Sequence, residues 1–401
     1  MVSIAAAIGV VGAIIIIGTL ITRLAEKTKI PNILPLLVLG IILGPASGLF
    51  DPMQFADLIR AVIMFALIVV LFDAGYGIRL KYLKQELLPS TLLAFFAVLA
   101  TVAIAVPLSI IFFHFSWQNG LLLGALIAST DITIILPLLK SINISTHTRN
   151  ILELESTINS PIAIIIATTA IGLLYGAKGA ALVAVPTFLY QLFIGIAIGV
   201  IFGFLLLRIL KRLGVEERPE ILSIGAILLV YAIAQLIGAS GIFAVFVSGI
   251  ILGNAKPPLK RIITSFRGNI ELLLVIFVFV ILGAMLKLNI LLSAGLLGLL
   301  FALIIFFSRA PVIYAYRRKW ADDEKYLFLM GPKGIVCAVL ALSFMHEFPS
   351  PNLVLGLVFI LILTTIIAAS LSQVLVGRIK IENFFKKPEE GKIGLESTKT
   401  G

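Results

Sequence analysis

Long apolar segments alternate with short polar ones along almost the whole chain, as in proteins that cross a membrane repeatedly. A membrane-spanning helix needs about 20 mostly apolar residues. Dividing the chain at its charged and Pro/Gly-rich positions predicts thirteen such helices, over residues 3–21, 31–48, 55–75, 88–114, 119–139, 151–175, 181–207, 220–238, 240–253, 268–286, 290–312, 325–345 and 352–376. The ninth is short for a full crossing, and a very short turn separates it from the eighth.

Two of these helices are interrupted at their middle by residues that a membrane helix rarely contains. The fifth carries Ser-Thr-Asp-Ile-Thr at 129–133, and the twelfth carries Gly-Pro-Lys-Gly at 331–334. An isolated carboxylate or ammonium deep in an apolar helix costs about 2.5–3.5 kcal/mol on insertion scales. Paired interrupted helices mark the binding sites of transporters, so we expect the two interruptions to meet.

Composition and the placement of charge strengthen this interpretation. Of the 401 residues, 60% are hydrophobic and 13% are charged, which is more apolar surface than a soluble chain of this length buries. Lysine and arginine concentrate in every second loop and in the C-terminal segment. This predicts a plasma-membrane protein with its N-terminus outside and its C-terminus in the cytoplasm. It also accounts for the net charge of +11 without a nucleic-acid partner.

The helix count predicts an internal symmetry. If the seventh helix is a linker, helices one to six and eight to thirteen form two halves of opposite orientation, and the interrupted fifth and twelfth helices become equivalent. The predicted fold is an all-α polytopic membrane protein with two inverted repeats and broken crossing helices. Residues 1–380 form this transmembrane domain, and residues 381–401 form a short polar cytoplasmic tail. The single Cys337 excludes an internal disulfide.

Asp131 is the first candidate for chemistry at the interruptions. Hydroxyls of Thr130 and Thr133 flank it, and with unwound backbone carbonyls they supply the oxygen ligands that a small monovalent cation accepts. One carboxylate holds either a proton or a cation but not both, and this mutual exclusion is sufficient for coupled exchange. The alternative is that Asp131 is only a counter-charge for Lys333 or for a helix end.

The sixth helix adds a polar stripe. A spacing of four residues places Glu155 and Asn159 on one face, with Ser156 and Ser160 on the adjoining strip. We expect Glu155 to pair with Lys333, so that both groups stay charged. A further cation, Arg309, either extends to the cytoplasmic surface or pairs with a carboxylate.

These residues carry a family resemblance that covers nearly the whole chain apart from the tail. The chain resembles the monovalent cation/proton antiporter family, in its branch of NhaP-type sodium/proton exchangers. Ala-Ser-Thr-Asp at 128–131 is similar to the family's Ala-Thr-Asp, and Glu-Ser-Thr-Ile-Asn-Ser-Pro at 155–161 to its Glu-Ser-x-x-Asn-Asp-Pro. Weaker support comes from Gly-Ala-Ser-Gly-Ile-Phe-Ala at 238–244 and from 331–334, which is similar to the family's Gly-Pro-Arg-Gly.

The resemblance implies a homodimer in a lipid bilayer that exchanges a cation for protons by elevator-like alternating access. Helices 1–3 and 7–10 would form the dimerisation scaffold, and helices 4–6 and 11–13 the mobile core. The expected cargo is Na⁺, with Li⁺ or K⁺ as alternatives, and the expected sodium ligands are Asp131, Thr130, Ser156 and Glu155. Lys333 and Arg309 would compensate charge. No cofactor is expected besides the transported ions.

Two positions depart from the family's pattern. Ser160 stands where the motif has an aspartate that carries the transported ion or proton, and serine cannot release a proton at physiological pH. Lys333 stands in place of arginine and lacks the planar fork that pairs with both oxygens of a carboxylate.

The first departure leaves three functions open: an antiporter centred on Asp131, a passive channel or uniporter, and a non-transporting regulatory homologue. An enzyme is not expected, because the sequence has no phosphate loop and no grouped nucleophile, base and orienting residue.

Overall fold

The computed structural model describes residues 4–28, 31–78, 86–132, 134–135, 144–175, 180–212, 219–255, 259–316 and 328–384. In this part of the chain the backbone is helical with short connections and contains no strand. The all-α prediction is therefore confirmed. Thr133 lies outside the described residues, so its predicted role is not tested, and the same holds for most of the tail.

The first half of the chain and the linker contain α1 (Ile4–Thr28), α2 (Ile33–Ile41), η1 (Ile42–Ala46), η2 (Pro52–Phe55), α3 (Ala56–Gly77), α4 (Leu87–Phe113), α5 (Trp117–Ala128), α7 (Thr146–Tyr175) and α8 (Ala180–Arg212). The second half contains α9 (Pro219–Leu236), α10 (Gly241–Gly253), α11 (Leu259–Ala284), α12 (Leu288–Phe307), α13 (Ala310–Tyr316), α15 (Ile335–Phe344), η5 (Met345–Glu347) and α16 (Pro351–Phe384).

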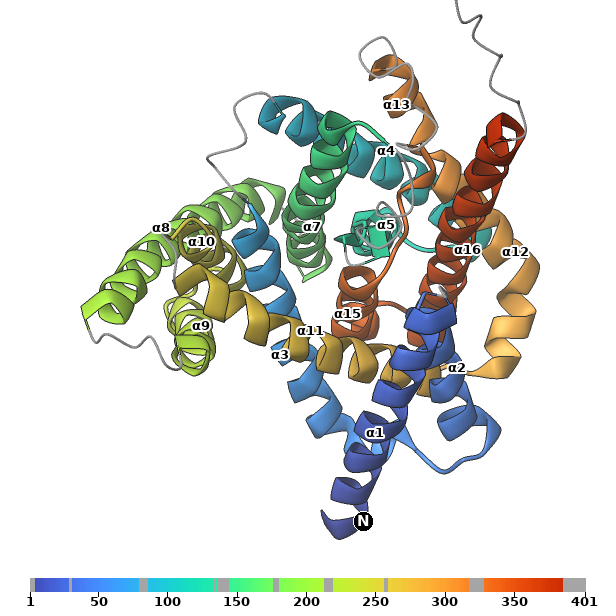
Figure 1. Cartoon of the computed structure of the whole chain (residues 1–401), viewed down its shortest axis with the longest axis horizontal. Helices are drawn as coiled ribbons and strands as arrows, with labels where there is room; N and C mark the ends of the chain where they lie inside the picture. Colours follow the sequence, from blue (N-terminus) through green and yellow to red (C-terminus); the bar gives the residue numbers. More distant parts are fainter. Residues whose placement is uncertain are drawn as a thin grey trace, which may run out of the picture.

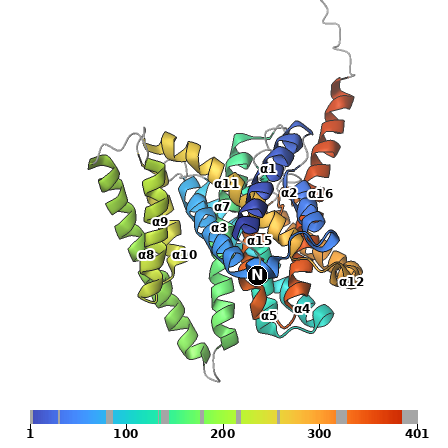
Figure 2. The same cartoon turned by 90° about the horizontal axis from the view of Figure 1, so that it is seen from below.

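Two short helices, α5 and α15, lie at the centre of the molecule (Figure 1). Helices α8, α9 and α10 form a group on one side, and α12 and α16 lie on the other. After a turn of 90° the same separation is visible, with α8 and α9 at one edge and α16 near the other (Figure 2). The two helices that adjoin the predicted interruptions are therefore enclosed by the longer helices.

Close helix contacts repeat between the two halves. Glycines let α3 and α10 approach until a Cβ on Gly249 would collide with the carbonyl of Phe72. Between α2 and α11, a Cβ on Gly283 would collide in the same way with the carbonyl of Leu37. Small residues permit such backbone contact in membrane proteins. In the predicted symmetry α2 corresponds to α10 and α3 to α11, so these two contacts are equivalent.

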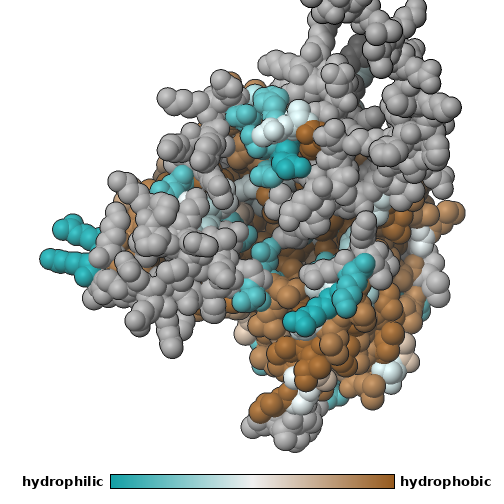
Figure 3. Space-filling view, in the orientation of Figure 1, coloured by the Kyte–Doolittle hydropathy of each residue, from teal (hydrophilic) through white to brown (hydrophobic). Residues whose placement is uncertain are grey.

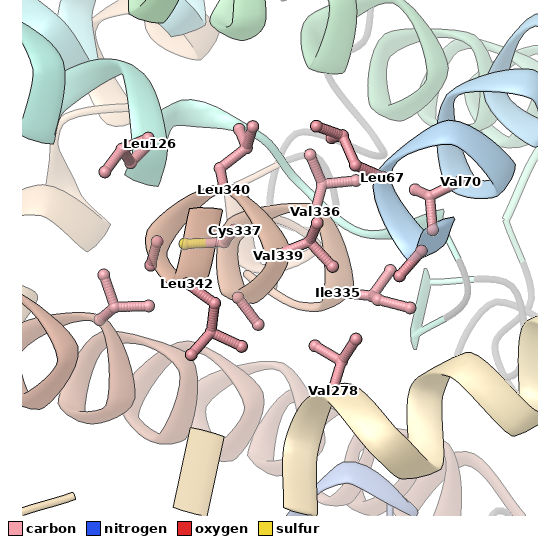
Figure 4. Close-up of a cluster of buried hydrophobic side chains, with 14 of the residues drawn as sticks. Leu67, Val70, Leu126, Val278, Ile335, Val336, Cys337, Val339, Leu340 and Leu342 are labelled. Carbon is pink, nitrogen blue, oxygen red and sulfur yellow. The ribbon is translucent and has the colours of Figure 1, made fainter. Parts of the chain in front are cut away.

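Helix α15 is apolar on every side because it is surrounded on every side. All its residues from Ile335 to Leu342 are buried, as expected for a helix without a polar face. Figure 4 shows Cys337, Leu340 and their neighbours on α15 between Leu126 of α5, Leu67 and Val70 of α3, and Val278 of α11. This packing fixes where the start of α15 can lie.

The outer surface is apolar over much of its area. Side chains of α1 such as Ile16, Leu20 and Leu24 are exposed, and Figure 3 shows a broad hydrophobic area on the lower right of the face it presents. Among the described residues, seven helices are long and apolar enough to cross a membrane, and shorter apolar helices accompany them. Every predicted span overlaps one of these helices, while the number that cross stays a prediction.

Candidate functional site

Helix α5 ends at Ala128, in the middle of the apolar segment 119–139 that was predicted to be one helix. The next residue, Ser129, is extended with φ −64° and ψ 139°. The last carbonyls of a helix lack intrahelical partners and carry a partial negative charge. The Nζ of Lys333 donates a hydrogen bond of 2.7 Å to the carbonyl oxygen of Ala128. A buried ammonium from the other broken segment therefore caps the end of α5.

The start of α15 shows the opposite arrangement. The backbone N–H of Ile335, its first residue, donates to Oδ2 of Asp131 at 2.5 Å. The N–H of Asp131 donates to the carbonyl of Pro332 at 2.9 Å. A Cβ on Gly334 would collide with the Asp131 carboxylate. A carboxylate from the first broken segment thus occupies the partially positive end of α15.

The two breaks therefore cap each other with opposite charges. Lys333 and Asp131 are both buried, at 6% and 2% exposure. A third helix, α16, holds the crossing in place, because the backbone N–H of Lys333 donates to Oγ1 of Thr365 at 3.0 Å. The expectation that the two interruptions meet is confirmed.

Thr130 connects the crossing to the polar stripe on α7. Its hydroxyl donates to Oγ of Ser156 at 3.2 Å and accepts a short hydrogen bond from Nδ2 of Asn159. The same amide nitrogen lies 3.3 Å from Oε1 of Glu155. Four of the predicted site residues therefore form one buried hydrogen-bonded cluster, which we call the α7 cluster: Thr130, Glu155, Ser156 and Asn159.

Ser160 lies beside this cluster, one turn further along α7. Its hydroxyl is 2.7 Å from the hydroxyl of Ser129 and 3.4 Å from Oδ1 of Asn159. Both serines are almost fully buried. The position where the family's motif has an aspartate is therefore part of a neutral hydroxyl pair.

Glu155 has a different cationic partner from the one expected. Oε2 of Glu155 lies 3.0 Å from Nη2 of Arg309, and the exposures of the two side chains are 0% and 8%. Lys333 points its ammonium to the end of α5 instead. The prediction that Glu155 pairs with Lys333 is wrong, because the carbonyl at the end of α5 takes the lysine and leaves the glutamate to Arg309. Of the two alternatives for Arg309, pairing with a carboxylate is the correct one.

A small cavity lies between the crossing and these charged groups. It offers about 20 Å³ to the centre of a water-sized sphere, enough for roughly one water. Its wall includes Thr130, Glu155, Arg309 and Lys333. Residues from α4, α12 and α16 complete it, among them Thr101, Ser308 and Thr365.

Sequence reasoning missed several of these contacts. Thr365 and Ser129 were not singled out, although each bonds a predicted site residue, and neither were Thr101 and Ser308, whose hydroxyls lie 3.2 Å apart at the cavity. The available signals were that Ser129 belongs to the interruption at 129–133 and that Ser308 adjoins Arg309. A threonine in an apolar helix such as α16 commonly bonds its own backbone, so the sequence gave no sign that Thr365 belongs to the site.

The arrangement supplies oxygen ligands rather than a cluster of strong metal ligands. Among the described residues no three His, Cys, Asp or Glu side chains are grouped to hold a metal ion. Thr130 belongs to the α7 cluster and directly precedes Asp131 in the chain, so the hydroxyls and the carboxylate of the cluster adjoin Asp131. This suits a weakly held monovalent cation, whose affinity must allow release.

Comparison with known proteins gives consistent results. Residues 12–377 match the profile of the family described as "Sodium/hydrogen exchanger, transmembrane". The K⁺/H⁺ antiporter NhaP2 of Shewanella oneidensis is 28% identical over 379 residues, which are 91% of this chain and 66% of that protein. The Na⁺/H⁺ antiporter 1 of Methanocaldococcus jannaschii is 29% identical over 359 residues, covering 84% of this chain and 83% of that protein. This chain thus spans about two thirds of the length of the Shewanella relative.

The fold of the M. jannaschii antiporter is also similar. The structure of its sodium proton antiporter MjNhaP1 at pH 8 superposes with a TM-score of 0.83 at 26% identity. The superposition covers 93% of this chain and 98% of that one. The predicted antiporter fold is confirmed.

Proposed function

Because the chain belongs to the sodium/hydrogen exchanger family, in its NhaP-type branch, we propose that it exchanges a monovalent cation for protons across a membrane. Asp131 is the proposed shared site, which holds a cation and a proton in turn. One observation carries this proposal: the broken helices cross at Asp131, and the adjoining Thr130 is bonded to the α7 cluster. Ionisable groups inside a membrane are retained chiefly where ions pass.

Competition at Asp131 supplies the coupling. A cation at the crossing is stabilised by the ionised carboxylate of Asp131 and by oxygens of Thr130, Ser156 and Glu155. Protonation removes the negative charge, so that the cation leaves. The bond from the Ile335 N–H then holds the protonated group at the start of α15. Binding of either ion therefore excludes the other.

The proposed cargo is Na⁺. The ligands here are small hard oxygens, and the relatives named above comprise both a sodium and a potassium antiporter. Cavity size and coordination number decide between these ions, so Li⁺ and K⁺ are tested beside Na⁺. No cofactor takes part in the proposed exchange.

Movement of the crossing past a stationary scaffold provides alternating access in this proposal. The scaffold consists of α1–α3 and α8–α11 and is also the surface for a homodimer. The core consists of α4, α5 and α7 together with α12, α13, α15 and α16, and it carries the site. We place the protein in the plasma membrane, with the N-terminus outside and the C-terminal tail in the cytoplasm, on the distribution of Lys and Arg.

One observation favours a second candidate function. The Ser129–Ser160 hydroxyl pair replaces a carboxylate by neutral groups, and Asp131 has a capping role that does not require transport. A passive cation channel or a non-transporting regulatory homologue would retain this arrangement.

Proton movement in proteoliposomes distinguishes these functions. With an imposed pH gradient and a pH-sensitive dye, we expect Na⁺ to dissipate the gradient, and Asp131→Asn to abolish the response while leaving the protein monodisperse. Asp57→Asn is the matched control, because Asp57 is a fully exposed carboxylate. If the unmodified protein is inactive and Ser160→Asp restores exchange, the antiporter proposal is contradicted for the native chain and the second candidate stands.

A further inference from the structure

The cavity beside the crossing has more buried positive than negative charge on its wall. Arg309 and Lys333 line it, and Glu155 is the only carboxylate among the described residues that does so. Asp131 bonds the start of α15 and is not part of this wall. With the usual ionisation states, the wall of the cavity carries a net charge of one positive unit.

Three donor nitrogens and one acceptor oxygen on this wall, all from Arg309 and Glu155, are buried without a hydrogen-bond partner among the described residues. Nε, Nη1 and Nη2 of Arg309 are buried and have no hydrogen-bond partner among the described residues. Nη2 of Arg309 lies 3.0 Å from Oε2 of Glu155. The two atoms form an ion pair, but neither makes a hydrogen bond of good geometry. Lys333 has three ammonium donors and gives one to Ala128. A buried donor without an acceptor is costly.

Arg309 is held in this position from several sides. Its side chain is 8% exposed. A Cβ on Gly331 would lie 2.6 Å from Nη1, so the backbone of the second broken segment passes directly over the guanidinium. The donors have little access to solvent, because the Arg309 side chain is buried and the edge-to-face pair of Phe306 and Phe328, 5.2 Å between ring centroids, lines the same wall.

We propose that this cavity binds a small monovalent anion of the chloride class, held between the guanidinium of Arg309 and the ammonium of Lys333. An anion supplies the missing acceptor to both groups and neutralises the excess charge. The cavity leaves about 20 Å³ for the centre of a water-sized sphere, which is room for roughly one water. Acetate- and phosphate-sized anions are therefore too large for it. Asp131 is outside this wall, while Thr130 and Glu155 belong both to the wall and to the proposed cation ligands, so the anion site adjoins the cation site and goes beyond the proposed exchange.

Direct binding of radioactive chloride tests this site independently of transport. Equilibrium dialysis uses the purified full chain in detergent, with gluconate replacing chloride at constant ionic strength. We expect saturable binding to a single site, with bromide competing and gluconate failing to compete. Lys333→Met should weaken chloride binding about ten- to a hundredfold, the loss expected for a charged hydrogen bond. Lys287→Met, which removes an exposed lysine, should leave it unchanged.

A second pair of variants guards against a folding defect in Lys333→Met. Ala97 lines the cavity, and Ala100 is on the same helix outside its wall. Ala97→Leu should fill the cavity and abolish chloride binding with all charges present, whereas Ala100→Leu should retain it. Absence of saturable binding by the unmodified chain, or equal losses in the matched controls, would overturn the proposal and leave the cavity to water. Neither result depends on whether the chain exchanges cations.

Discussion

At the scale of single residues, the buried charges of this protein differ in how they are balanced. Asp131 and Lys333 meet helix ends, whereas Glu155 meets Arg309 across a charge contact. Removing one member of a buried ion pair leaves an uncompensated charge, which costs more than the pair contributes. The cost of a substitution therefore depends on what remains behind.

The Glu155–Arg309 contact provides a test. Arg309→Met should reduce the free energy of unfolding by about 3–5 kcal/mol, measured as a lower midpoint of thermal unfolding in detergent. Adding Glu155→Gln to Arg309→Met should recover part of the loss, because the orphaned charge is gone. The control is Arg60→Met, which breaks a 3.7 Å contact with Asp57 at side-chain exposures of 73% and 99% and should leave the midpoint unchanged. Similar effects of Arg309→Met and Arg60→Met would contradict this account.

Residue identities alone predicted part of the site. The i, i+4 spacing on α7 correctly placed Glu155 beside Asn159, and Thr130, predicted to belong to the same site, bonds Ser156 and Asn159. The partner of Glu155 was not predictable in this way. Arg309 and Lys333 are both distant in sequence from Glu155, and only the geometry of the capped end of α5 decides between them.

At the scale of elements, the break in the twelfth predicted helix depends on one missing side chain. Gly334 precedes α15 and leaves room for the Asp131 carboxylate at the first N–H groups of the helix. A glycine that permits this approach is not interchangeable with alanine, even though alanine is the better helix former.

Gly334→Ala should therefore abolish exchange and lower thermal stability, because the added methyl group displaces Asp131 from Ile335. Gly295→Ala is the matched control, since a Cβ there meets nothing within 4 Å and alanine favours the helix. Initial rates in proteoliposomes and unfolding midpoints provide the measurements. Retention of full exchange by Gly334→Ala would show that the carboxylate need not occupy this position.

Hydrophobic patterning predicted the elements better than their ends. The short turn expected near 237–241 separates α9, ending at Leu236, from α10, starting at Gly241, and Gly238 adopts the positive φ of 72° that the turn requires. By contrast, the fifth predicted helix was drawn through to 139, while α5 ends at Ala128. Apolar residues continue past the break, so hydropathy did not reveal its position, although the polar residues did.

At the scale of the whole molecule, the proposed scaffold and core meet in part through a small separate apolar cluster. Ile78, which follows α3, and Leu154 of α7 form it, with Phe246 and Ile250 of α10 packed against them. Such a surface has no hydrogen bond among its side chains to resist sliding. It is a suitable place to test whether the two parts move.

Cross-linking across this cluster should stop exchange. Leu154→Cys with Phe246→Cys, joined by a short bis-methanethiosulfonate that forms a disulfide with each thiol, ties α7 to α10 and should block transport until a reductant cleaves these disulfides. Ile78→Cys with Ile250→Cys joins two residues within the proposed scaffold and should leave exchange intact after the same treatment. Background reaction is small because the single Cys337 is fully buried. Unchanged exchange by a fully cross-linked 154–246 variant would contradict the proposed division.

The reciprocal capping of the two breaks has a consequence for the time course of any rearrangement. Each half-helix ends on a charge supplied by the other broken segment, so unwinding one end removes the support of the other. Local opening in proteins proceeds in cooperative units, and this crossing meets the condition for a single unit. The amide hydrogens of Asp131 and Ile335 then exchange with solvent through one shared opening event. For the same reason, the two breaks rearrange in one step with a single rate, whereas two independent breaks would rearrange with two different rates.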